Sequence, residues 1–142
     1  MPYQISVFSE NKPGKIERIT GILARENINI RAITISDAGD YGIVKLLLDK
    51  PDTACDLLQE NGVAAALKEV VAVRVEDRVG GLHDIAQVLR KNDINVDDAY
   101  AFITQAKKEA VFVFQCADIK RAERILRDHG LILLTETELY LI

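Results

Sequence analysis

The sequence has few aromatic residues. Its 142 residues include no tryptophan, four tyrosines and four phenylalanines, although hydrophobic residues make up 49% of the chain. We therefore expect a core of aliphatic side chains. No apolar run approaches the roughly 20 residues that a membrane-spanning helix needs, and the N-terminal Met-Pro-Tyr-Gln-Ile lacks the pattern of a secretory signal peptide. These absences predict a protein without a membrane partner.

Positive charge is also scarce. The 18 lysines and arginines are outnumbered by 22 aspartates and glutamates, the net charge is −4, and Lys107-Lys108 is the single pair of adjacent lysines. Nucleic acids and anionic membrane surfaces are bound by basic patches. RNA-binding domains of the RRM type also need exposed aromatic pairs. We therefore expect no nucleic-acid partner.

Cysteine and histidine are too few and too dispersed for a metal site. The two cysteines, Cys55 and Cys116, form no Cys-x-x-Cys motif, and the two histidines lie far apart. Isolated cysteines predict a reduced, cytoplasmic setting. The sequence also lacks a nucleophile–base pair and a phosphate-binding glycine loop. We therefore expect neither a cofactor nor enzymatic activity.

The chain instead contains an internal repeat. Residues 11–30 align with residues 77–96 at a constant offset of 66 and without a gap. The matched positions are Gly14 with Gly80, Ile16 with Leu82, Ile19 with Ile85, Leu23 with Leu89, and Ile28-Asn29-Ile30 with Ile94-Asn95-Val96. A period of this length indicates two copies of a small domain rather than a solenoid. We place the two domains at 1–68 and 69–142.

Hydrophobic periodicity predicts the same order of elements in both copies. The first copy has predicted strands at 4–8, 30–37, 43–49 and 63–67, a helix capped by Asn11, and a helix capped by Asp52 or Thr53 and ended by Gly62. The second copy has predicted strands at 70–75, 96–104, 110–116 and 131–134, a helix opened by Gly80-Gly81, and a helix capped by Asp118 and ended by Gly130. This order predicts an α+β fold of two ferredoxin-like βαββαβ units. Each unit would be an antiparallel sheet with its helices on one face.

The C-terminal residues 138–142 follow the second copy. They read Glu-Leu-Tyr-Leu-Ile, so four of the five are apolar or aromatic. We expect them to form a strand that pairs with an open sheet edge. A frayed terminus is the alternative.

The turn before the first helix of each copy is the best candidate for a binding site. Gly14 and Gly80 would let the backbone approach a ligand closely. The N–H groups at the start of the following helix favour an anion such as a carboxylate. Asn11 and Asp77 would add side-chain oxygens, and Asp77 could pair with a ligand ammonium group. The alternative is structural, because glycine is an ordinary turn residue and a duplicated turn repeats with its domain.

These motifs resemble the ACT domain family. The resemblance rests on Asp/Asn-x-Pro-Gly-x-Leu/Ile, an amphipathic helix, and Ile-Asn-Ile entering a strand, and it covers both copies. It implies a regulatory module that binds an amino acid or a similar small effector at a domain interface. It also implies domains that pair side by side through their sheets, as in a homodimer. With no enzyme attached, the chain resembles free-standing tandem ACT proteins, which implies a partner enzyme or regulator.

The resemblance also implies a set of ligand-binding residues. In the first copy these are Asn11, Pro13, Gly14, Lys15 and Ile16, with Asn29 as a neighbour across the interface. In the second copy they are Asp77, Val79, Gly80, Gly81 and Leu82, with Asn95 as the corresponding neighbour. Lys15 departs from the family pattern of a small or apolar residue and would crowd its pocket, so the second copy is the better candidate.

Two functions remain open from the sequence. The first is an amino-acid-sensing regulatory protein, for which the aliphatic residues Ile16, Ile30, Leu82 and Val96 favour a small or branched effector, although they also suit a core. The alternative is a ligand-independent dimerisation or interaction module, since paired sheets need no ligand.

Overall fold

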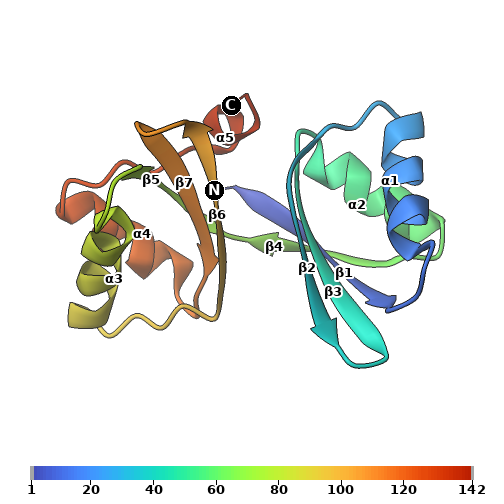
Figure 1. Ribbon diagram of the computed structural model, residues 1–142, viewed down its shortest axis with the longest axis horizontal. Coiled ribbons are helices and arrows are strands. Elements are labelled where there is room, and N and C mark those ends of the chain that lie inside the picture. Colours follow the sequence, from blue (N-terminus) through green and yellow to red (C-terminus); the bar gives the residue numbers. More distant parts are fainter. Residues whose placement is uncertain (1, 142) are drawn as a thin grey trace. The chain divides into compact units, whose positions relative to one another are not determined.

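The structure, a computed structural model, describes residues 2–141 (Figure 1). Contacts within the chain divide these residues into two compact units. The first unit is Tyr3–Lys68, joined by Leu141, and the second is Glu69–Tyr140, joined by Pro2. Each unit therefore contains one copy of the repeat.

The first unit is a four-stranded sheet with two helices. Its elements are β1 (Tyr3–Glu10), α1 (Lys15–Arg25), β2 (Ile30–Ala38), β3 (Tyr41–Leu48), α2 (Pro51–Glu60) and β4 (Ala64–Glu69). The strand order is β2-β3-β1-β4, and β3 pairs antiparallel with both β1 and β2. This arrangement is the predicted ferredoxin-like unit, and α1 and α2 cover one face of the sheet (Figure 1).

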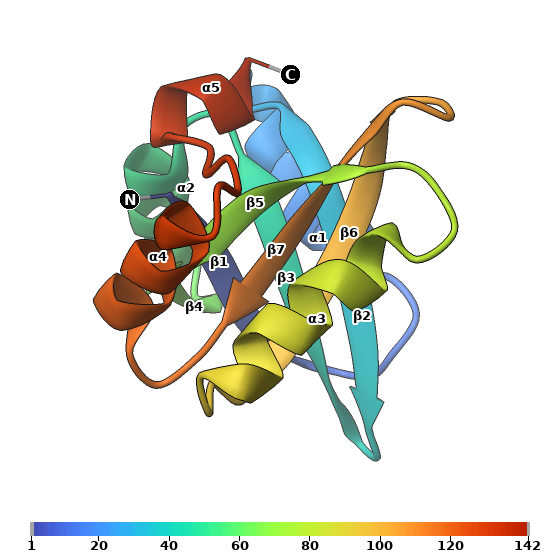
Figure 2. The same cartoon turned by 90° about the vertical axis from the view of Figure 1, so that its left-hand side faces the viewer.

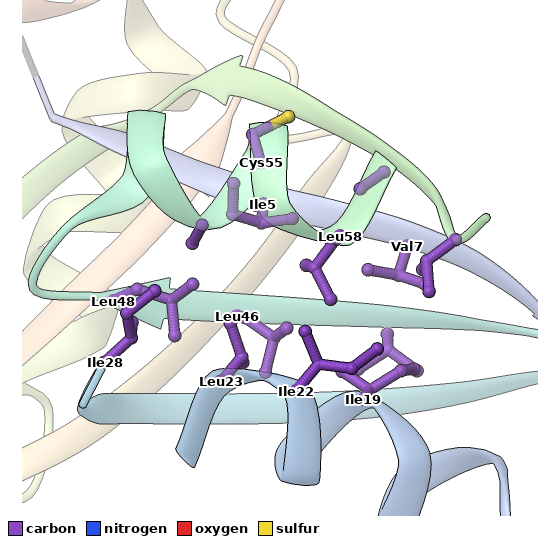
Figure 3. Close-up of a cluster of buried hydrophobic side chains, with 14 residues drawn as sticks. Ile5, Val7, Ile19, Ile22, Leu23, Ile28, Leu46, Leu48, Cys55 and Leu58 are labelled. Atoms are coloured by element: carbon purple, nitrogen blue, oxygen red, sulfur yellow. The ribbon is translucent and has the colours of Figure 1, made fainter. Parts of the chain in front are cut away.

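The core of the first unit is aliphatic, as the composition predicts. Residues at helical spacing on α1, namely Ile19, Ile22 and Leu23, are buried. Figure 3 shows these side chains pointing towards Leu46 of β3 and Leu58 of α2, which are fully buried. The cluster positions the start of α1 against the end of β1.

The second unit repeats this plan with a smaller sheet. Its elements are β5 (Val71–Glu76), α3 (Gly81–Lys91), β6 (Asp98–Gln105), β7 (Glu109–Gln115), α4 (Ile119–Asp128) and α5 (Glu136–Tyr140). The strand order is β5-β7-β6, and β7 pairs antiparallel with both neighbours. Figure 2 shows α3 and α4 on one face of this sheet. Phe114 contributes an aromatic ring to the core, where Ile85, Leu89 and Leu126 are also buried.

The predicted fourth strand of the second copy, 131–134, is reduced to one bridge between Leu133 and Val73. Two backbone hydrogen bonds flank it, from Arg74 N–H to the Ile132 carbonyl (2.8 Å) and from Leu134 N–H to the Ala72 carbonyl (2.9 Å). The segment cannot extend further along β5 because a helical turn begins directly after it.

That turn corrects the prediction for the C-terminus, because residues 136–140 form the helix α5 and not a strand. The hydroxyl of Thr135 accepts a hydrogen bond from Glu138 N–H (3.3 Å), and its carbonyl accepts one from Leu139 N–H (2.9 Å). Thr-x-x-Glu is a capping box, which stabilises a helix start. Leu139 is fully buried, so the segment is anchored. The final predicted strand position, Ile142, lies outside the described residues.

The helix caps agree with the sequence in part. Asp118 caps α4 as predicted and accepts a hydrogen bond from Arg121 N–H (3.0 Å). Gly14, not Asn11, is the cap of α1. For α2 the prediction of Asp52 or Thr53 was wrong: Lys50 is the cap, because Pro51 with its fixed φ takes the first helical position.

Candidate functional site

The repeated glycines Gly14 and Gly80 adopt the same left-handed conformation. Their φ values are 89° and 84°, and each immediately precedes the first residue of a helix. Side chains other than that of glycine are disfavoured there, because a Cβ crowds the following carbonyl. The turn therefore needs glycine for its backbone geometry in both copies.

The helix starts leave N–H groups available next to these glycines. The first in-helix hydrogen bonds run from Arg18 N–H to the Gly14 carbonyl and from Asp84 N–H to the Gly80 carbonyl, both 3.0 Å. The N–H groups of residues 16, 17, 82 and 83 come before these first donors, so they have no acceptor within their helix. Together with the positive end of the helix dipole, such groups favour an anion.

Asn11 ties the first turn to the β2–β3 hairpin. Its N–H donates to the Asp40 carbonyl (2.8 Å). Its side-chain amide donates to Asp37 Oδ1 (3.1 Å) and to the Gly39 carbonyl (3.3 Å). The predicted site residue therefore has a structural role within the unit.

Asp77 has the matching role in the second unit. Its Oδ2 accepts a hydrogen bond from Lys107 N–H (2.6 Å), and its own N–H donates to the Lys108 carbonyl (3.1 Å). Lys107 has a positive φ of 62°, so the carboxylate holds an unfavourable hairpin turn in place. The repetition of Asn or Asp at this position has a physical cause that does not need a ligand.

Gly81 is glycine for a packing reason. It is buried, and a Cβ added there would lie 2.3 Å from the Glu76 carbonyl oxygen. The start of α3 is therefore pressed against the end of β5. In the first unit the same position is Lys15, whose Nζ lies 3.9 Å from the Glu10 carboxylate. The predicted asymmetry between the two turns is thus accompanied by a different packing of helix against strand.

Within a unit, the structure does not bring the two asparagines to the glycine turns. Asn29 and Asn95 follow the C-terminal ends of α1 and α3. Each helix has 11 residues, which corresponds to about 16 Å at 1.5 Å per residue. Asn29 N–H donates to Asp49 Oδ1 (3.0 Å), and the Asn95 amide donates to Asp97 Oδ1 (3.0 Å).

The remaining predicted residues differ in exposure. Val79 is fully exposed, and Leu82 is 48% exposed. Ile16 is half-buried and packs against the first core. Pro13 is exposed.

Sequence reasoning missed a pair of pockets beside the turns. The pocket in the first unit has a volume of about 180 Å³, and the pocket in the second unit about 200 Å³. Each pocket lies between the end of the unit's first strand, the first turn of its first helix, and the segment that follows its second helix. Corresponding residues line them: Ser9 and Val75, Glu10 and Glu76, Lys15 and Gly81, Arg18 and Asp84, Ile19 and Ile85, Gly62 and Gly130, Val63 and Leu131. Gly62 and Gly130 follow the second helix of each unit and, like Gly14 and Gly80, recur in both copies. Taken together, the two pairs of glycines indicate where these pockets form.

The two pockets carry different charges on the helix. Arg18 in the first pocket donates to the Asn61 carbonyl, while Asp84 takes the equivalent position in the second. Arg78 bridges the second turn, with Nε 2.8 Å from Glu76 Oε2 and Nη2 2.5 Å from Asp84 Oδ2. These hydrogen bonds raise the pKa of Arg78. One guanidinium therefore pairs with two carboxylates at the second turn, and the three side chains together keep one negative charge.

The first turn has a simpler ion pair. Lys12 Nζ lies 2.6 Å from Glu10 Oε2, and this hydrogen bond lowers the pKa of Glu10. Both residues are well exposed, so the pair is screened by water and salt.

The cysteines offer no reactive centre. Cys55 and Cys116 are free, and burial raises the pKa of both thiols, which disfavours the nucleophilic thiolate. Within residues 2–141 no cluster of three or more His, Cys, Asp or Glu side chains is placed to hold a metal ion. In that same part of the chain, no helix is long and apolar enough to cross a membrane.

Two ferredoxin-like units in one chain, each with a left-handed glycine before its first helix, define a tandem of two small domains of one architecture. The family model described as an ACT domain pair matches residues 2–142, so the chain belongs to this family. The resemblance inferred from the sequence is confirmed. An ACT domain pair is a regulatory fold that often binds amino acids.

Solved structures share this architecture. Protein BT0572 from Bacteroides thetaiotaomicron is 28% identical, with a TM-score of 0.93 over 99% of this chain and 96% of that one. The regulatory subunit of aspartate kinase from Thermus thermophilus is 14% identical, with a TM-score of 0.65 over 89% of this chain and 91% of that subunit. At that identity the second likeness shows the fold alone. No curated protein matches the chain.

Proposed function

We propose that this protein is an amino-acid-binding regulatory protein with no catalytic role of its own. The observation that carries the proposal is the duplicated turn, in which Gly14 and Gly80 are both left-handed and both precede a helix start with available N–H groups. Such a turn suits the carboxylate common to all amino acids. Membership of the ACT domain pair family supports the same effector class.

The second unit is the better candidate for binding. Lys15 stands over the first turn, whereas Gly81 leaves the second turn free of a side chain at that position. Asp84 in the first turn of α3 would repel a carboxylate, and its ion pair with Arg78 reduces this repulsion. Arg78 would bind a ligand carboxylate only in exchange for Glu76 or Asp84, because its Nε and Nη2 already donate to those side chains.

Regulation would work by a population shift. An effector that binds one conformation more tightly than another favours that conformation by its difference in binding free energy. A partner enzyme or regulator would respond to the favoured state. Homodimerisation and the placement of the effector between paired domains stay predictions.

A thermal shift screen tests the proposed function. Each of the twenty amino acids would be added to the full chain at millimolar concentration. A ligand at about 100 times its Kd stabilises the folded state by about 2.7 kcal/mol, which raises the Tm by several degrees. Equilibrium dialysis with the positive compounds would confirm binding. The absence of any shift across the set would count against the proposal.

The rival function is a ligand-independent interaction module. The roles of Asn11, Asp77 and Gly81 in holding the turns favour it, because those residues have structural partners. Gly80→Ala separates the two functions, provided that circular dichroism shows the variant to be folded despite the left-handed backbone at this position. A sensor with this substitution loses its response to the effector, whereas an interaction module keeps its partner.

A further inference from the structure

The exposed side of α4 in the second unit carries a basic stripe, which consists of Lys120, Arg124 and Arg127. Their spacing of four and then three residues places them on one side of the helix, and all three are exposed. Within the described part of the chain, none of these three side chains has a hydrogen bond or an ion pair. The fourth cation of the helix, Arg121, instead donates to the Asn92 carbonyl (2.7 Å).

The equivalent helix of the first unit, α2, carries the opposite charge. Both helices have 10 residues, and they begin at residues 51 and 119, an offset of 68. At this offset Asp52 corresponds to Lys120, and Asp56 corresponds to Arg124. Together with Glu60, the two aspartates form an acidic stripe at a spacing of four residues, and α2 contains no lysine or arginine. These three acids are also exposed, and none of the described residues pairs with them.

The like charges within each stripe repel one another. Residues four apart on a helix are neighbours, and two charges of one sign there destabilise the helix. Asp56 lies four residues from both Asp52 and Glu60, and Arg124 lies four residues from Lys120. A helix surface that only faces water gains from mixed signs at this spacing. Each stripe is therefore stabilised when a surface of the opposite charge covers it.

The two stripes match in length. At 1.5 Å per residue, Asp52 and Glu60 are about 12 Å apart along α2, and Lys120 and Arg127 are about 10 Å apart along α4. The middle residues, Asp56 and Arg124, therefore face each other whether two such helices run parallel or antiparallel. Three pairs of opposite charge fit along one contact.

We infer that two copies of this chain associate through these helices, with the basic stripe of each copy against the acidic stripe of the other. A second copy fits because every chain provides both stripes. A two-fold axis forms the contact twice, so that all four stripes of the pair are covered. This surface differs from the sheet-to-sheet pairing that the family resemblance implies. The inference needs no effector and is independent of the proposed function.

The contact is expected to be weak and sensitive to salt. Single exposed ion pairs contribute little, and salt screens them. Complementary stripes mainly raise the rate of encounter and select the orientation. Sedimentation equilibrium of the full chain in about 0.05 M and about 0.5 M salt tests this. We expect a dimer at low salt and a dissociation constant at least about tenfold higher at high salt.

Charge reversal at the middle of each stripe tests the residues. Arg124→Glu and, separately, Asp56→Arg place like charges opposite each other in both contacts of the pair. Each variant should raise the dissociation constant at low salt at least about tenfold. The matched controls are Lys91→Glu on α3 and Glu17→Arg on α1, which reverse exposed charges outside the stripes. Both controls should leave association unchanged, and circular dichroism checks that every variant is folded.

An equimolar mixture of Arg124→Glu and Asp56→Arg distinguishes contact between copies from contact within one chain. In a mixed pair, the reversed helix of one chain meets the reversed helix of the other, and the two natural helices also meet. We expect the mixture to dimerise within about threefold of the affinity of the natural chain.

Three results would overturn the inference. The first is a natural chain that stays monomeric at low salt. The second is a dimer that neither charge reversal weakens, which would indicate pairing through another surface such as the sheets. The third is a mixture that fails to dimerise although the natural chain does, since the charges would then act within one chain or bind a different acidic or basic partner.

Discussion

Gly81 shows how one residue decides the packing of a helix against a strand. Glycine inside a helix normally costs about 0.5–1 kcal/mol relative to alanine. Here a Cβ would lie 2.3 Å from the backbone oxygen of Glu76, too close without a backbone shift. The crowding therefore outweighs the gain in helix propensity.

Gly81→Ala should lower the free energy of unfolding by about 1–3 kcal/mol, as for other overpacked positions. Urea denaturation measures the change. Gly21→Ala in α1 is the control, because the nearest atom to its added Cβ is the end of the flexible Arg25 side chain at 3.8 Å. A gain in stability for Gly81→Ala would show that the start of α3 has room to move.

Tyr100 provides a prediction for alkaline pH. Burial is the main cause of its raised pKa, with smaller contributions from Asp98 and Tyr140. The unfolded chain loses the phenol proton near pH 10, whereas the folded chain retains it. Stability from this group is therefore present below about pH 10 and decreases as the pH rises above it.

The stability of the natural chain should fall more steeply above about pH 10 than that of Tyr100→Phe. Chemical denaturation at a series of pH values measures this difference. An ultraviolet titration of tyrosinate should also show a late step that Tyr100→Phe lacks. Parallel stability curves for the two proteins would contradict the assignment.

Some residues of the candidate site could be predicted from the sequence, and others could not. The glycine turns were predicted, because Gly14 and Gly80 recur within a matched pattern. The structural partners of Asn11 and Asp77 were not, because they lie about 30 residues away in the hairpins. Their hydrogen bonds depend on how each hairpin folds back on its turn.

At the scale of elements, amphipathic helices were the most predictable feature. Helices α1 and α3 follow from apolar residues at helical spacing after a glycine. The C-terminal segment was predicted incorrectly because four apolar or aromatic residues outweighed the capping signal. Thr135-Glu-Thr-Glu138 was present in the sequence and is sufficient to start a helical turn.

The cap of α5 can be tested by substitution. Thr135→Ala removes the side-chain hydrogen bonds to Glu138 and should destabilise the protein by about 1 kcal/mol. Thr137→Ala is a matched control in the same helix, at an exposed position where alanine is neutral or slightly favourable. Thermal denaturation of both variants gives the comparison. Equal Tm values would mean that burial of Leu139 alone holds the segment.

At the scale of the whole molecule, the duplication made the fold predictable, whereas the differences between the copies were predicted only at the turns. A pattern that recurs at one offset predicts the same topology twice, and both sheets share the order of their first three strands. The groove that Ala86, Val96 and Phe112 line beside α3 was not predicted, because these residues come together from α3, the segment after it and β7. The predicted strand 131–134 forms a single bridge.

Unequal copies should respond unequally to an effector. A ligand that binds only the folded second unit raises the free energy of its opening by RT ln(1 + [L]/Kd), or about 2.7 kcal/mol at 100 times Kd. Amide hydrogen exchange of the full chain, with and without an amino acid that binds in the thermal shift screen, measures this locally. Peptides from α3 and β5 should exchange about 100-fold more slowly, while those from α1 and β1 keep their rates. Equal protection of both units would show either two sites or tight coupling between them, and Lys15 would then not close the first turn to ligand.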